Sequence, residues 1–338
     1  MTSRGNFRVN SRSVRGLLCT IAALATSVAL APASPAAAAA SDSLHPSVTA
    51  TEDVTDRLHL LRITSPAMGR EVAVNVIAPA DISEPRGVFY LLDGNSGQVD
   101  TTNWLDPRRG NAEEFFADKN AYVVMPVGGT GSLYSDWETD HPKFGKTKWE
   151  TFLTEELPPL IDAQFATNGH NVIGGISSGA QGALMLASRS PDLYTGAVGY
   201  SGCYLTEGPI GKALTDLVVI NGMANSEMMW GPEGSEPWRE HDLFRNASAL
   251  AGKKVYLASG NGLPGPHESL NHQDIAQTVI VGGLLEAGSN LCTDQLAQAL
   301  RDAGVDVTRS AQPVGVHAWP YWRDELGRSW PTIESALR

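Results

Sequence analysis

Short apolar runs alternate with amphipathic stretches along most of this chain. Between residues 149 and 165, Leu153, Leu157 and Ile161 recur four positions apart, a spacing that indicates a helix. Strands that alternate with helices are typical of an α/β fold, with a mostly parallel sheet flanked by helices. The predicted strands are residues 71–77, 87–92, 121–127, 171–176, 195–200, 254–258 and 307–312, and the predicted helices are 149–165, 180–187, 274–286 and 293–303.

Two segments depart from this alternation. The opening segment reads as two strands joined around Ser65 to Gly69, the second of which is 71–77, and this favours an antiparallel hairpin at the sheet edge. Residues 205–250 contain glycine, proline, tryptophan and methionine without a steady period. Because such a stretch is long for a loop, we interpret it as an irregular cap insertion above the sheet.

The first 40 residues have the pattern of a secretory signal peptide. Four arginines precede an apolar stretch, 16–31, and an alanine-rich run ends at Ala40. The apolar stretch is short for a membrane-spanning helix, which needs about 20 residues. We therefore expect residues 1–40 to be removed and residues 41–338 to form a single domain, secreted or held in the cell envelope without a transmembrane anchor.

Charge and motif content exclude several kinds of partner. The 338 residues have a formal net charge of −12 and no basic cluster, so neither nucleic acid nor an anionic membrane surface is expected as a partner. The chain also lacks CxxC, HExxH and phosphate-loop patterns. No metal, nucleotide or flavin cofactor is predicted.

A glycine-rich turn surrounds Ser177. Gly175-Ile176-Ser177-Ser178-Gly179 matches G-x-S-x-G, the turn of α/β-hydrolases in which a strand reverses into a helix and holds a serine above the sheet. A predicted strand precedes this turn and a predicted helix follows it, which favours a nucleophilic serine over a merely tight turn. The Ser178 N–H would then point to a developing oxyanion.

A serine nucleophile needs a histidine base, and in this fold class the base follows the acid in the chain. His317 lies in a loop just after the last predicted strand, where the base is expected. The alternatives are His241, His267 and His272, which lie in polar regions typical of solvated histidines.

The acid that orients the histidine is less well defined by the residues. Asp274, Glu286 and Asp294 all lie between Ser177 and His317. Glu286 ends an apolar helical run, which favours an inward carboxylate, but spacing alone leaves the choice open.

The loop after strand 87–92 is the expected source of a second oxyanion donor. Asp93-Gly94 follows this strand directly and leaves the Asn95 N–H free to point at the serine. The alternative is an ordinary Asp-Gly turn.

Two cysteines remain after residue 40, Cys203 and Cys292. An exported protein meets oxidising conditions, so a Cys203–Cys292 disulfide is predicted, with two buried thiols as the alternative.

Seven segments follow one another from about Phe89 to Trp322: "YLLDGNSGQVDTTNW", "VVMPVGGTGSLYSDWE", "KWETFLTEELP", the Ser177 turn, "MMWGPEGSEPW", "YLASGNG" and "GVHAWPYW". In this order they resemble segments of the antigen 85 family of secreted mycolyltransferases. The resemblance implies an α/β-hydrolase fold and transfer of a long branched fatty acyl group between sugar hydroxyls through an acyl-serine intermediate.

The resemblance also assigns residues. The family's nucleophile falls on Ser177, its histidine on His317 and its glutamate, after a Leu-Leu pair, on Glu286. The remaining correspondences are the oxyanion amides of Asn95 and Ser178, the sugar-contacting Asp93, and Trp319.

This chain departs from the family at several of these positions. Asn95-Ser96 stands where the family has Leu-Arg, which removes an arginine that would contact the sugar. The acceptor is therefore left open among trehalose, arabinan and a protein hydroxyl. Cys203 and Cys292 have no counterparts in the family.

The expected function is transfer of a mycoloyl group from a trehalose mycolate, or a related glycolipid, to a sugar or other envelope hydroxyl. The first alternative is a secreted serine esterase that passes the acyl group to water. A non-catalytic envelope-binding protein on the same scaffold is the second, and an intact Ser/Glu/His set argues against it.

Overall fold

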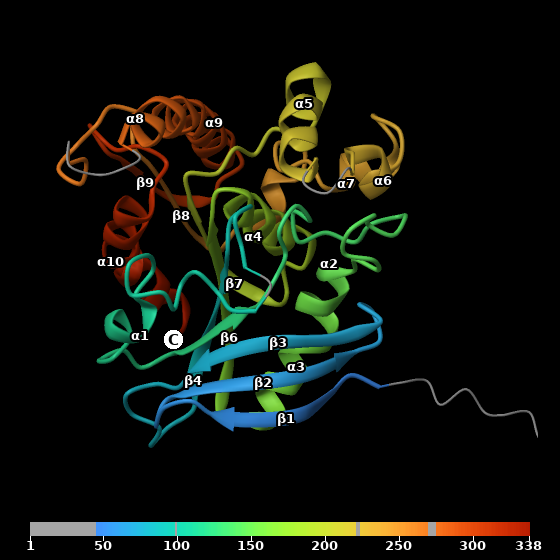
Figure 1. Cartoon of the computed structure of the whole chain (residues 1–338), viewed down its shortest axis with the longest axis vertical. Coiled ribbons are helices and arrows are strands. Elements are labelled where there is room, and N and C mark those ends of the chain that lie inside the picture. Colours follow the sequence, from blue (N-terminus) through green and yellow to red (C-terminus); the bar gives the residue numbers. More distant parts are fainter. Residues whose placement is uncertain (1–44, 99, 221–223, 270–274) are drawn as a thin grey trace, which may run out of the picture. The chain divides into compact units, whose positions relative to one another are not determined.

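The computed structural model describes residues 45–98, 100–220, 224–269 and 275–338. The predicted signal peptide, residues 1–40, lies outside these residues, as do His272 and Asp274. The described chain is built around a nine-stranded sheet of order β1-β2-β3-β5-β4-β6-β7-β8-β9 (Figure 1). Its strands are β1 Ser47–Asp53, β2 Leu58–Ser65, β3 Arg70–Ile77, β4 Arg86–Leu92, β5 Tyr122–Pro126, β6 Thr167–Ile176, β7 Tyr194–Tyr200, β8 Lys254–Ser259 and β9 Asp306–Ala311.

The sheet is antiparallel at one end and parallel over the rest. β1, β2, β3 and β5 pair antiparallel, whereas β5, β4, β6, β7, β8 and β9 pair parallel. β1 to β3 cross the later strands steeply in Figure 1, as expected of a twisted sheet. The α/β-hydrolase fold and the edge hairpin are therefore confirmed.

Helices cover both faces of the parallel part. In β4, Val88 and Tyr90 pack in one apolar core with the helices α3 Leu157–Gln164, α4 Ser178–Arg189 and α9 Gly283–Asp302. Phe89 and Leu91 point the other way, into a core with α1 Ala112–Phe115 and α10 Trp319–Ala336. A strand buried on both faces reads as a continuous apolar run, which is why β4 could be predicted.

The predicted cap, residues 205–250, contains short helices. Figure 1 shows them gathered beyond the end of the sheet. They are α5 Gly208–Val219, α6 Ser226–Trp230, α7 Glu236–Glu240 and η2 Ala247–Leu250. Trp230 of α6 and Trp238 of α7 are fully buried in a small apolar core that also includes Leu133, Trp137 and Met185.

The remaining helical segments are partly continuous with one another. α2 Trp149–Thr151, η1 Phe152–Glu156 and α3 form one helix, and α8 Ile275–Gln277, η3 Thr278–Gly282 and α9 form another. Within the described residues, only Ile275–Asp302 is long and apolar enough to cross a membrane, by length and composition alone, with 28% of the tested window buried. This stretch packs on β8 and β9 and carries the buried Glu286, as a helix of the folded domain does.

Candidate active site

Ser177 occupies a strained turn between β6 and α4. Its backbone has φ 53° and ψ −122°, outside the regions that most residues adopt. A Cβ at Gly175 would lie 2.7 Å from the Gly179 backbone, and one at Gly179 would collide with the Asp93 carbonyl oxygen. Only glycine fits at both positions, which explains the G-x-S-x-G spacing.

His317 lies within hydrogen-bonding distance of Ser177. It lies in the loop between β9 and α10, and its backbone N–H donates to the Gly282 carbonyl oxygen at 3.1 Å. The His317 Nε2 is 3.0 Å from the Ser177 Oγ. The opposite ring nitrogen, Nδ1, lies 2.8 Å from Glu286 Oε2. Because a carboxylate only accepts, Nδ1 carries the proton and Nε2 is left to accept one from the serine.

Glu286 is buried, with 1% of its surface exposed. Its Oε1 accepts the Ser201 hydroxyl at 2.7 Å and the Gly260 N–H at 2.6 Å. The Ser201 Oγ in turn accepts the Trp322 indole N–H at 2.9 Å. Together with His317 Nδ1–H, these donors compensate the carboxylate for the loss of water.

Sequence reasoning missed Ser201, Gly260 and Trp322. Ser201 and Gly260 each directly follow a strand, β7 and β8, and the carboxyl ends of parallel strands meet at one edge of the sheet. This rule about strand ends was the only signal in the sequence that could have pointed to Ser201 and Gly260. Ser201 also has a positive φ of 54°, which no sequence pattern predicts for a serine.

The other histidines and carboxylates considered above have different partners. His241 is buried and bonds to Glu150 Oε2 at 3.0 Å, and His267 pairs with Asp324 at 2.8 Å. Asp294 pairs with Arg309, also at 2.8 Å. None of these three is bonded to Ser177.

The loop after β4 approaches the serine from the side of β5. A Cβ at Gly94 would lie 3.2 Å from the Ser177 Cβ, so the next residue, Asn95, lies beside the nucleophile. The Asn95 side chain accepts the Gly131 N–H at 2.8 Å, which fixes the loop. Within the described residues no acceptor takes the N–H of Asn95 or of Ser178. Both amides are available for an oxyanion.

Asp93 lies below this loop and is 1% exposed. Burial raises its pKa to about 6, against the lowering effect of the Asn103 N–H, which donates to Asp93 Oδ2 at 3.0 Å. The predicted sugar contact of Asp93 is not tested by this geometry and stays a prediction.

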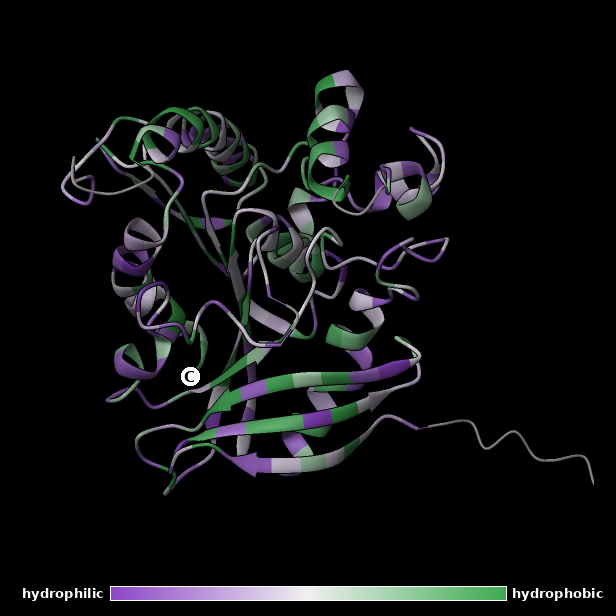
Figure 2. Ribbon diagram, viewed as in Figure 1, coloured by the Kyte–Doolittle hydropathy of each residue, from purple (hydrophilic) through white to green (hydrophobic). Residues whose placement is uncertain are grey.

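A cleft of about 590 Å³ opens beside His317. Its lining includes the apolar Val281, Leu285 and Trp319 and the charged Arg108 and Arg109. The side chains of Leu284 and Leu291, elsewhere on α9, point into solvent, and Figure 2 shows the apolar character of this helix. The cleft thus offers both apolar and charged groups to a substrate.

Cys203 and Cys292 form a disulfide with a Cα–Cα distance of 4.9 Å. Cys203 follows Ser201 by two residues, and Cys292 lies on the same helix as Glu286. The Thr293 hydroxyl also donates to the Gly202 carbonyl oxygen at 3.2 Å. The bridge therefore joins the end of β7 to the helix that carries the carboxylate.

No metal centre is found in the described part of the chain, where no group of three or more His, Cys, Asp or Glu side chains could hold an ion.

Known proteins resemble this chain over most of its length. The family described as "Putative esterase" matches residues 65–333. The diacylglycerol acyltransferase/mycolyltransferase Ag85A of Mycobacterium tuberculosis H37Rv is 31% identical over 287 residues, covering 82% of this chain and 80% of that protein.

Two solved structures are also similar to this chain over most of its length. The MPT51 (FbpC1) protein of Mycobacterium tuberculosis superposes with a TM-score of 0.67 and 26% identity, covering 86% of this chain and 99% of its own. An S-formylglutathione hydrolase from Agrobacterium tumefaciens, at 17% identity and a TM-score of 0.57, covers 85% and 99% and is similar in fold.

Proposed function

This chain belongs to the esterase family and is an antigen 85-like protein, and from that premise we propose that it transfers a mycoloyl group through an acyl-serine at Ser177. The observation that carries the proposal is the unbroken chain of hydrogen bonds from Ser177 through His317 to Glu286.

In the first half of the reaction, His317 Nε2 takes the proton of the Ser177 hydroxyl as its oxygen attacks the ester carbonyl of the donor. Glu286 holds the ring and stabilises the imidazolium. The N–H groups of Asn95 and Ser178 bind the oxyanion of the tetrahedral intermediate. His317 then protonates the leaving sugar oxygen, and the acyl group remains on Ser177.

In the second half, an acceptor hydroxyl gives its proton to His317 and attacks the acyl-serine. The tetrahedral intermediate collapses, the ester of the acceptor forms, and Ser177 recovers its proton. The same steps with water in place of the acceptor give hydrolysis.

The mixed apolar and charged lining of the cleft supports a substrate that is part lipid and part sugar. An acyl chain would lie against Val281, Leu285 and Trp319, and a polar head group against Arg108 and Arg109. The donor class is a trehalose mycolate or related glycolipid, and the acceptor is a sugar or other envelope hydroxyl. The predicted signal peptide supports a location outside the cytoplasmic membrane for this chemistry.

The second candidate function is that of a secreted carboxylic-ester hydrolase. The family description as an esterase favours it. In that reaction water takes the acyl group from Ser177 in place of a hydroxyl acceptor. A purely binding role does not account for the three aligned side chains.

The test is incubation of the purified protein with trehalose monomycolate, followed by mass spectrometry of the products. Trehalose dimycolate is expected from the wild type and not from Ser177→Ala. Free mycolic acid as the sole product would replace transfer by hydrolysis, and no product with any defined ester donor would refute both.

A further inference from the structure

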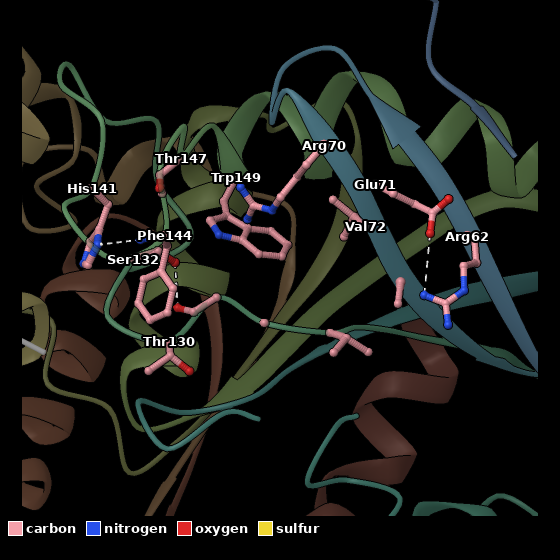
Figure 3. Close-up of a pocket in the computed structure, with 14 residues that line it drawn as sticks. Arg62, Arg70, Glu71, Val72, Thr130, Ser132, His141, Phe144, Thr147 and Trp149 are labelled. Carbon is pink, nitrogen blue, oxygen red and sulfur yellow. Dashed lines mark hydrogen bonds and ion pairs between the residues drawn. The ribbon is translucent and has the colours of Figure 1, made fainter. Parts of the chain in front are cut away.

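A second cavity, of about 240 Å³, lies between the β2–β3 hairpin and the loop from residue 127 to 147 (Figure 3). Arg62 comes from β2, and Arg70 and Glu71 come from the start of β3. The cavity shares no lining residue with the cleft beside His317. It is a separate site that the acyl-transfer chemistry leaves unused.

The inner wall of this cavity is firmly built. Ser132, Thr147 and Trp149 are all buried, and the Ser132 hydroxyl donates to the Gly129 carbonyl oxygen at 2.6 Å. The Thr147 hydroxyl donates to the Gly145 carbonyl oxygen at 2.9 Å. The wall formed by Ser132, Thr147, Trp149 and the neighbouring backbone borders a space large enough for a small polar molecule.

The charge at the mouth is positive. Arg62 and Glu71 form a loose pair, 3.5 Å apart and about half exposed, which partly offsets one of the two arginines. Within the described residues Arg70 has no carboxylate partner, and its guanidinium donates to the Lys146 carbonyl oxygen at 2.7 Å. Arg70 and Trp149 both line the cavity (Figure 3). Although Arg70 as a residue is exposed, partial burial of its guanidinium lowers its pKa.

We propose that this cavity binds an anionic group, a phosphate or a carboxylate, through the guanidinium of Arg70. A guanidinium presents several donors in one plane and binds such oxyanions with two parallel hydrogen bonds. An anion here would also be the negatively charged partner that Arg70 lacks among the described residues.

The cavity wall is in direct contact with the oxyanion loop. The Thr130 hydroxyl donates to the Gly97 carbonyl oxygen at 2.7 Å, and the Gly131 N–H donates to Asn95 Oδ1. Gly128, Gly129 and Thr130 also line the cavity. The cavity lining is therefore connected, through Thr130 and its neighbour Gly131, to the loop that presents the Asn95 amide.

The experiment measures phosphate binding to the purified chain by isothermal titration calorimetry. Inorganic phosphate is expected to bind the wild type saturably, and Arg70→Gln is expected to weaken binding about tenfold or more, the usual effect of losing charge-assisted hydrogen bonds. Glu71→Gln is expected to tighten binding several-fold, because it removes the one carboxylate that repels the anion. Arg301→Gln, at an exposed arginine of α9, is the matched control and should bind as the wild type does.

Flotation with phosphatidylcholine vesicles, with and without phosphatidylglycerol, distinguishes a lipid phosphate from a free one. Enrichment on the phosphatidylglycerol vesicles that Arg70→Gln abolishes identifies a lipid head group, and a response to inorganic phosphate alone identifies a soluble ligand. No response to either probe, or an equal loss in Arg301→Gln and Arg70→Gln, overturns the proposal. Ser177→Ala should bind normally, so this result is independent of the acyl-transfer proposal.

Discussion

The Ser177 Oγ and the His317 Nε2 lie 3.0 Å apart although 140 positions separate the two residues in the chain. Ser177 comes from the turn after β6 in the centre of the sheet, and His317 comes from the loop after the edge strand β9. The fold brings them together because parallel strands end at the same edge of the sheet.

Replacing Ser177 by alanine should abolish acyl transfer and ester hydrolysis. The nucleophile is lost, and only binding and the oxyanion amides remain, so kcat is expected to fall by about 10⁵-fold or more. Labelling with a fluorophosphonate probe checks this directly. Strong labelling of Ser177→Ala would place the reactive serine elsewhere, and an unchanged melting temperature controls for folding.

Glu286→Gln should lower kcat by about 10³- to 10⁴-fold while leaving the serine in place. A neutral amide does not stabilise the imidazolium, and it permits the tautomer with the proton on Nε2, which cannot accept the proton of Ser177. Steady-state hydrolysis of p-nitrophenyl butyrate measures the loss. A decrease smaller than tenfold in a folded variant would remove Glu286 from the mechanism.

Leu285→Ser should reduce the activity toward long-chain esters selectively. Leu285 lines the cleft, so losing its apolar side chain is expected to lower kcat/KM for p-nitrophenyl palmitate about tenfold, with little effect on the acetate. Leu284→Ser is the matched control, since Leu284 is 73% exposed and does not line the cleft. Equal effects of the two substitutions would contradict an acyl chain along this part of the cleft.

Asp93→Asn should change how stability depends on pH. Burial raises the pKa of Asp93 to about 6, so its neutral form stabilises the fold at low pH, and that contribution is lost as pH rises from about 4 through 6. Asparagine stays neutral and still accepts the Asn103 N–H. The variant should therefore gain up to about 3 kcal/mol over the wild type between pH 4 and pH 7. Urea unfolding at several pH values measures the difference, and a difference that does not vary with pH would be the contrary result.

Loss of the Cys203–Cys292 bridge should destabilise the chain. The cysteines are 89 positions apart, and opening a loop of this length is expected to cost about 2–4 kcal/mol of unfolding free energy. Thermal unfolding of the double serine variant, with and without a phosphine reductant, measures the effect. The reductant should lower the melting temperature of the wild type and leave that of the variant unchanged; equal wild-type values in both conditions would contradict the prediction.

The sequence predicted those elements whose residues have one dominant role. β4 and β6 are buried on both faces and read as apolar runs, and the Ser177 turn is defined by glycines that the backbone itself requires. β1 was not predicted, because it is an edge strand, Ser47–Asp53, in which every residue except Val48 is exposed. α10 was also missed. It begins at Trp319, only two residues after His317.

The sequence did not determine which carboxylate contacts His317. Glu286 and Asp294 lie on the same helix, yet one is buried against His317 and the other pairs with Arg309. That difference depends on how α9 packs against β8 and β9, which involves strands far away in the chain. Ser201 and Gly260 were missed for the same reason. Each contributes one hydrogen-bond donor, a hydroxyl or a backbone amide, whose position depends on the tertiary structure.

The position of His317 near the end of the chain has a consequence for biosynthesis. Ser177 precedes His317 by 140 positions, and His317 follows β9, the outermost parallel strand. Under the proposed mechanism, a nascent or truncated chain that stops short of β9 would carry the serine without its base and should be inactive.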